Sequence, residues 1–205
     1  MLFGRKIPYL LLTLLFAALW LALLLLTPPE RTLGVIIRWV FAHGSLTQAS
    51  VYLFLMAALT AAGYLLGNKN LAAWVHVMAV VAFGLWVLGF VISAIPAKIA
   101  WGVLVDFNEP RTQMTLRVTA VGLIFLVLVW WINQTKFTAI SLIAFAFILL
   151  FLVRSTSLIR HPANPIGESP DRLLPILYSG IVLSAVLATL SFVGYLVERK
   201  KASQA

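Results

Sequence analysis

Six long apolar stretches follow one another along the chain, separated by shorter polar segments. They cover residues 7–27, 49–67, 71–94, 114–132, 137–154 and 173–197. A helix needs about 20 apolar residues to cross the hydrocarbon core of a bilayer, and each stretch approaches or exceeds this length. The pattern therefore predicts an all-α integral membrane protein with six transmembrane helices. Residues 1–197 form a single six-helix domain in this interpretation, and residues 198–205 form a short basic tail.

Short and long polar segments alternate between the apolar stretches. Two of them are tight turns with the sequences GNKN and INQTK, and six crossings place both turns on the same side as the two termini. Basic clusters at 5–6 and 199–201 flank the termini, and Lys and Arg are enriched in cytoplasmic segments of membrane proteins. We therefore expect a multi-pass protein of the cytoplasmic (inner) membrane, with both termini in the cytoplasm and three longer loops outside.

The first outer loop has a helical pattern of its own in the sequence TLGVIIRWVFAHGSL. Apolar residues recur at helical spacing from Leu33 to Phe41, and Arg38 falls on another face of the same helix. Such a pattern is typical of a helix that lies in the membrane interface. The sequence thus predicts a short interfacial helix that ends beside His43.

Composition supports a bilayer environment and narrows the possible partners. Of the 205 residues, 62% are hydrophobic and only 10% are charged, which a water-soluble domain would not tolerate. The formal net charge of +9 has no accompanying basic patch with interleaved aromatic residues, so it indicates contact with membrane lipid or topology signals and no nucleic-acid binding. The chain has no cysteine, so metal chemistry would depend on histidine or oxygen ligands.

The three histidines are the first candidates for chemistry. His43 and His161 fall in the first and third outer loops, and two imidazoles from separate loops could bind one haem iron. The alternative is that each is an ordinary interfacial residue. His76 falls inside the third apolar stretch, where a hydrogen bond between helices is the more ordinary role, so we do not count it as a ligand.

The carboxylates do not form a recognisable catalytic arrangement. Asp106 and Glu109 share the second outer loop, but no residue in that loop has the spacing of a nucleophile with its base. The six apolar stretches contain no carboxylate of the kind that a proton-coupled transporter buries. We therefore expect a protein that is not an enzyme and not a secondary transporter.

The order of these features resembles a known family. A histidine in VFAHGSLTQASVY, a tryptophan-containing second outer loop after FGLWVLGFVISAIPAKIAWG, and a second histidine in FLVRSTSLIRHPA follow one another in six predicted helices. This order is similar to the haem-handling C subunit of the Ccm-type cytochrome c maturation machinery and, more widely, to the WWD-motif haem-handling proteins. The resemblance covers nearly the whole chain. It implies that haem b is held transiently at the outer face by His43 and His161.

The motif that names the family is degraded in the second outer loop, WGVLVDFNEPRTQM. Trp101 agrees with the family pattern, whereas Phe107 and Asn108 stand where a tryptophan and the aspartate are expected. Trp101 and Phe107 still offer aromatic surface on which a porphyrin could stack. Asn108 keeps its hydrogen-bonding capacity without the charge, and Arg111 lies nearby.

The resemblance also suggests a role for the basic residues of the outer loops. Arg38, Arg154 and Arg160 could pair with the haem propionates, or they could bind lipid phosphates. Partners implied by the family are a haem chaperone, an ABC transporter and a small membrane adaptor. Two other interpretations remain open: a degenerate relative that serves as a structural subunit of a larger respiratory or photosynthetic membrane complex, and a b-type electron carrier.

Overall fold

The computed structural model of the chain describes residues 8–156 and 171–203, and it confirms six membrane-spanning helices. The helices are α1 (Tyr9–Leu26), α2 (Ile37–Leu65), α3 (Ala72–Trp101), α4 (Pro110–Ile132), α5 (Thr135–Ser155) and α6 (Leu173–Ala202). A short 3₁₀ helix, η1 (Lys69–Leu71), leads into α3. All six long helices are long and apolar enough to cross a bilayer.

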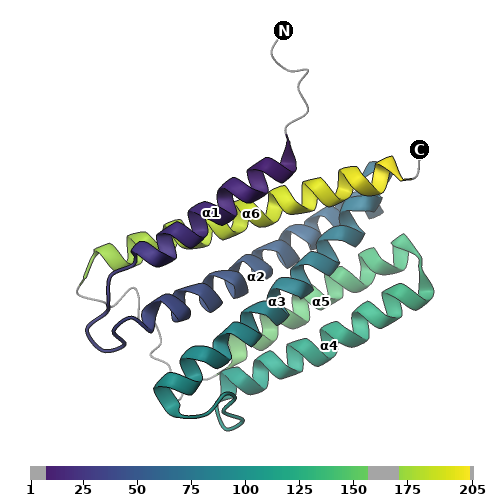
Figure 1. Cartoon of the computed structure of the whole chain (residues 1–205). Coiled ribbons are helices and arrows are strands. Elements are labelled where there is room, and N and C mark those ends of the chain that lie inside the picture. Colours follow the sequence, from purple (N-terminus) through teal and green to yellow (C-terminus); the bar gives the residue numbers. More distant parts are fainter. Residues whose placement is uncertain (1–7, 157–170, 204–205) are drawn as a thin grey trace.

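α2 is the centre of the bundle. It packs against α3, α5 and α6 and touches α1, whereas α1 lies mainly along α6 and α4 contacts α3 and α5 (Figure 1). The start of α1, the end of α6 and the two tight turns lie at one end of the bundle, which we call the turn end. α2, α4 and α6 begin at the other end, which we call the loop end (Figure 1). This arrangement confirms the predicted grouping of termini and short turns.

The predicted interfacial helix is not a separate element. α2 begins at Ile37 and continues without a break to Leu65, so Arg38 and His43 belong to the helix that crosses the membrane. No proline interrupts this segment. Gly44 lies within it, and the absence of a side chain there leaves space for the hydroxyl of Tyr178. A Cβ atom on Gly44 would lie only 2.8 Å from that hydroxyl oxygen. The expectation of a short helix followed by a histidine loop was therefore wrong.

The second outer loop is also shorter than the apolar pattern suggested. α3 continues through Pro96 to Trp101, and α4 begins at Pro110. Proline is accepted inside membrane helices because neighbouring groups can compensate for the missing backbone hydrogen bond. The connection is therefore limited to residues 102–109, with Trp101 as the last residue of α3 and Arg111 in the first turn of α4.

Close packing of α2 against α3 fixes the position of the loop-end half of α2. Ser50 Oγ donates a hydrogen bond to the carbonyl oxygen of Ala82, at 2.8 Å. Further toward the loop end, Gly89 lets the two backbones approach, since a Cβ atom there would lie 2.6 Å from Thr47 Oγ1. Small residues commonly permit such close contact between membrane helices. The register between α2 and α3 is therefore set close to His43.

Candidate functional site at the loop end

His43 is a half-buried residue of α2 and lies near the loop end of the bundle. A Cβ atom on Gly89 would lie 3.4 Å from the carbonyl oxygen of His43, so the two residues are at the same height. Side chains of an α-helix tilt toward its N-terminus. Because α2 begins at the loop end, the imidazole of His43 is inclined toward the long connections and away from the middle of the bundle.

Trp101 lies much further along the bundle axis than His43. It follows Gly89 by twelve residues of α3, which corresponds to about 18 Å of helix. α2 extends only six residues beyond His43, to Ile37, or about 9 Å. α3 therefore projects past the start of α2 by about 9 Å, and the backbones of His43 and Trp101 are not side by side.

Two hydrogen bonds order the 102–109 connection, one to the start of α4 and one within the connection. The side-chain amide of Gln113 donates to the carbonyl oxygen of Phe107 at 2.9 Å, and the backbone N–H of Asn108 donates to Asp106 Oδ1 at 3.1 Å. The Phe107 side chain is 65% exposed, and that of Trp101 is half-buried. Phe107, which stands where the resemblance expects a tryptophan, thus projects from the protein and does not pack into it.

The two acids of this connection are buried. Asp106 is 8% exposed and Glu109 only 1% exposed, and neither is among the site residues that the sequence predicts. Their spacing gave no signal of this burial, because it depends on how the connection folds against its surroundings. In the part of the chain that the structure describes, no three His, Cys, Asp or Glu side chains gather as a metal site.

The predicted haem-facing arginines differ in their surroundings. Arg38 Nε donates a hydrogen bond to the carbonyl oxygen of Thr27, at 2.9 Å, and so satisfies a backbone acceptor just beyond the end of α1. Arg111 and Arg154 are exposed at the loop end. Arg160 and His161 lie outside the described residues, so the second predicted iron ligand has no described position.

His76 occupies the opposite end of the bundle. Its Nε2 atom lies 3.1 Å from Thr135 Oγ1, which joins α3 to the first residue of α5. This is the hydrogen bond between helices that the sequence suggested for it. His76 is therefore remote from the candidate site at the loop end.

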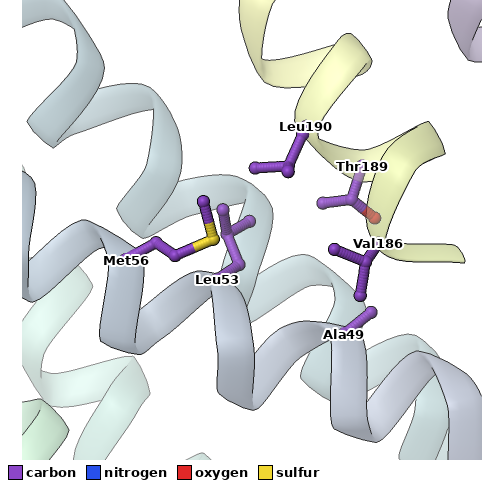
Figure 2. A pocket seen from close by; sticks show the side chains of 6 residues that line it. All are labelled: Ala49, Leu53, Met56, Val186, Thr189 and Leu190. Atoms are coloured by element: carbon purple, nitrogen blue, oxygen red, sulfur yellow. The ribbon is translucent and has the colours of Figure 1, made fainter. Parts of the chain in front are cut away.

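A crevice between α2 and α6 offers no alternative site for a cofactor. Its empty space is only about 150 Å³ even with its open side included, and it leaves no room for a water molecule, whereas ordinary ligand sites measure roughly 300 to 1,000 Å³. Figure 2 shows the lining side chains, which are Ala49, Leu53, Met56, Val186, Thr189 and Leu190. None is charged, none is an imidazole, and the Thr189 hydroxyl already donates to the carbonyl oxygen of Ala185.

No family model matches this chain, and no curated protein matches it significantly.

Proposed function

We propose that the protein is a haem-handling membrane protein of cytochrome c biogenesis that holds haem at its loop end for transfer to a partner. The observation that supports this most directly is the position of His43, half-buried on the central helix and near the end where the long connections lie. Haem is cargo in this proposal, so the chain would bind and release it without making or breaking bonds in it.

The donor set at the loop end fits haem in its chemistry. His43 supplies an imidazole for the iron, with His161 as the second ligand implied by the family resemblance. Arg111 and Arg154 have exposed guanidinium groups for the propionates. Arg38 is a weaker candidate, because its Nε atom is already bonded to the Thr27 carbonyl.

The exposed apolar tip of the 102–109 connection suits contact with another protein. Leu104 and Phe107 are 60% and 65% exposed, and this exposure makes them reachable. A haem chaperone, the partner implied by the resemblance, could dock on this tip beside the bound haem. We further propose that the loop end faces outward, since the basic termini lie at the other end.

A structural role in a larger respiratory or photosynthetic membrane complex is the second candidate. The observation that favours it is the separation of about 18 Å along α3 between the level of His43 and Trp101. One flat macrocycle would have to bridge this height to use both residues. In a structural subunit no such bridging is needed, and Phe107 would be covered by a neighbouring subunit.

Haemin titration of the detergent-purified protein decides between the two. If the protein carries haem, added haemin gives a low-spin absorption spectrum that is lost or shifted in both His43→Ala and His161→Ala. His76→Ala is the matched control, because it removes the same group at the turn end. Circular dichroism checks that each variant keeps its helices. If no such spectrum appears, or if neither the His43 nor the His161 substitution changes it, the carrier function is ruled out and the structural role remains.

A further inference from the structure

An open groove separates α4 from α5 toward the loop end. The two helices are joined at the turn end and pack firmly where the rings of Phe125 and Phe145 stack with centroids 5.6 Å apart. Beyond this contact the groove opens to a volume of about 590 Å³. Its lining consists of Arg117 and Val121 from α4 and of Phe147, Ile148, Phe151 and Leu152 from α5.

The groove lies where a membrane-spanning protein meets lipid. Among the described helices α4 touches only α3 and α5, so no helix covers this side of the pair. Phe147 and Phe151 are each 70% exposed. Five of the six lining side chains are apolar, which suits a hydrocarbon chain and gives an aqueous solute little to bind.

Arg117 makes the groove unlike the rest of the surface. It follows Pro110 by seven residues of α4, or about 10 Å of helix. No other Lys, Arg, Asp or Glu in the six described helices lies so far from an end of its helix. Its exposed guanidinium has no hydrogen bond or ion pair to any described residue. A charge at such depth is costly unless it finds a partner.

We propose that this groove is a binding site for an anionic membrane phospholipid. The guanidinium of Arg117 reaches along α4 toward the headgroup layer and pairs with the lipid phosphate, for which its planar fork is suited. One acyl chain of the same lipid lies in the groove against Val121, Phe147 and Phe151. The lining has no imidazole or thioether that could bind haem iron, so the site is separate from the proposed haem site.

Native mass spectrometry of the detergent-purified, delipidated protein tests the site. The probes are dioleoyl phosphatidylglycerol and dioleoyl phosphatidylcholine, which share acyl chains and differ in headgroup charge. We expect the wild type to retain the anionic lipid preferentially, and Arg117→Gln to weaken that retention about tenfold, as the loss of one charge-assisted contact implies. Arg31→Gln is the control, because Arg31 is an exposed arginine in the connection between α1 and α2 and is not in the groove.

A second variant separates the site from a general effect of charge. Phe151→Ala leaves the net charge unchanged and removes one wall of the groove, so it should lower the retention of both lipids. The proposal is overturned if the wild type retains the two lipids equally, or if Arg31→Gln weakens retention as much as Arg117→Gln does. It is also overturned if the wild type is a dimer that Arg117→Gln dissociates, because a second copy of the chain would then fill the groove.

Discussion

The contact between Gly89 and Thr47 permits a sharp test of how α2 is held. A methyl group on Gly89 would meet Thr47 Oγ1 at 2.6 Å, the Thr47 backbone nitrogen at 3.3 Å and the His43 carbonyl oxygen at 3.4 Å. The Thr47 hydroxyl cannot turn away without cost, since it donates a hydrogen bond to the His43 carbonyl at 2.8 Å. Gly89→Ala must therefore push α2 and α3 apart or break this bond.

The magnitude follows from two opposing terms. Ala is favoured over Gly in a helix by about 1 kcal/mol, whereas an extra methyl group in a close-packed contact costs about 1 to 3 kcal/mol. Gly84 lies on the same helix, and a Cβ atom added there would have no neighbour within 4 Å, so Gly84→Ala gains the propensity without the clash. The free energy of unfolding of Gly89→Ala should thus be about 1 to 3 kcal/mol below that of Gly84→Ala.

Unfolding in mixed micelles with increasing SDS, followed by circular dichroism, measures this difference. Thr47→Ala removes the atom nearest to the new methyl group, so the Thr47→Ala, Gly89→Ala double variant should be more stable than the sum of the single effects, by about 1 kcal/mol. Two results would refute the reasoning: equal stability of Gly89→Ala and Gly84→Ala, or strict additivity of the two substitutions.

Two further predictions concern the loop end. Thr32 and Asn70 are exposed at opposite ends of the bundle, and the chain has no cysteine. In intact cells an impermeant thiol reagent should therefore label Thr32→Cys and spare Asn70→Cys. The reverse labelling pattern would show that the proposed orientation is inverted. Arg38→Gln removes the bond to the Thr27 carbonyl and should lower the free energy of unfolding by about 1 kcal/mol with little change in haemin affinity, whereas Arg154→Gln should weaken haemin binding in the same titration. If Arg38→Gln weakened haemin binding as much as Arg154→Gln, Arg38 would have to contact a haem propionate.

The number of crossings could be predicted from the sequence, but the ends of the helices could not. An apolar stretch reports which residues suit hydrocarbon, and all six stretches became helices. Backbone hydrogen bonding continues past the last apolar residue, so α2 starts well before residue 49 and α3 runs past residue 94 to Trp101. Arg38 and His43 were assigned to a loop for this reason.

The sequence predicted that His43 and Trp101 share one end of the bundle, but not how far apart they lie along its axis. Parity of the crossings puts His43 and Trp101 at the same end, whichever residues pack together. Their separation along the axis depends on which part of α3 faces His43, and that is decided by the contact at Gly89. The sequence shows Arg117 as a charge inside an apolar stretch. Only the structure shows the neighbouring groove, from which a function for that charge can be proposed.

His43 is held more rigidly by its surroundings than Phe107 is. The loop-end half of α2 is fixed to α1 by the bond from Arg38 to Thr27, to α6 by the close approach of Gly44 to Tyr178, and to α3 at Gly89. Phe107 instead stands on an eight-residue connection, where the bond from Gln113 holds its backbone and leaves its side chain exposed. If haem is carried here, we expect the imidazole to keep its position while the aromatic contact changes, because a ligand on a packed helix moves less than a side chain at a loop tip. Transfer of haem to a partner docked at Phe107 would then end with release from His43.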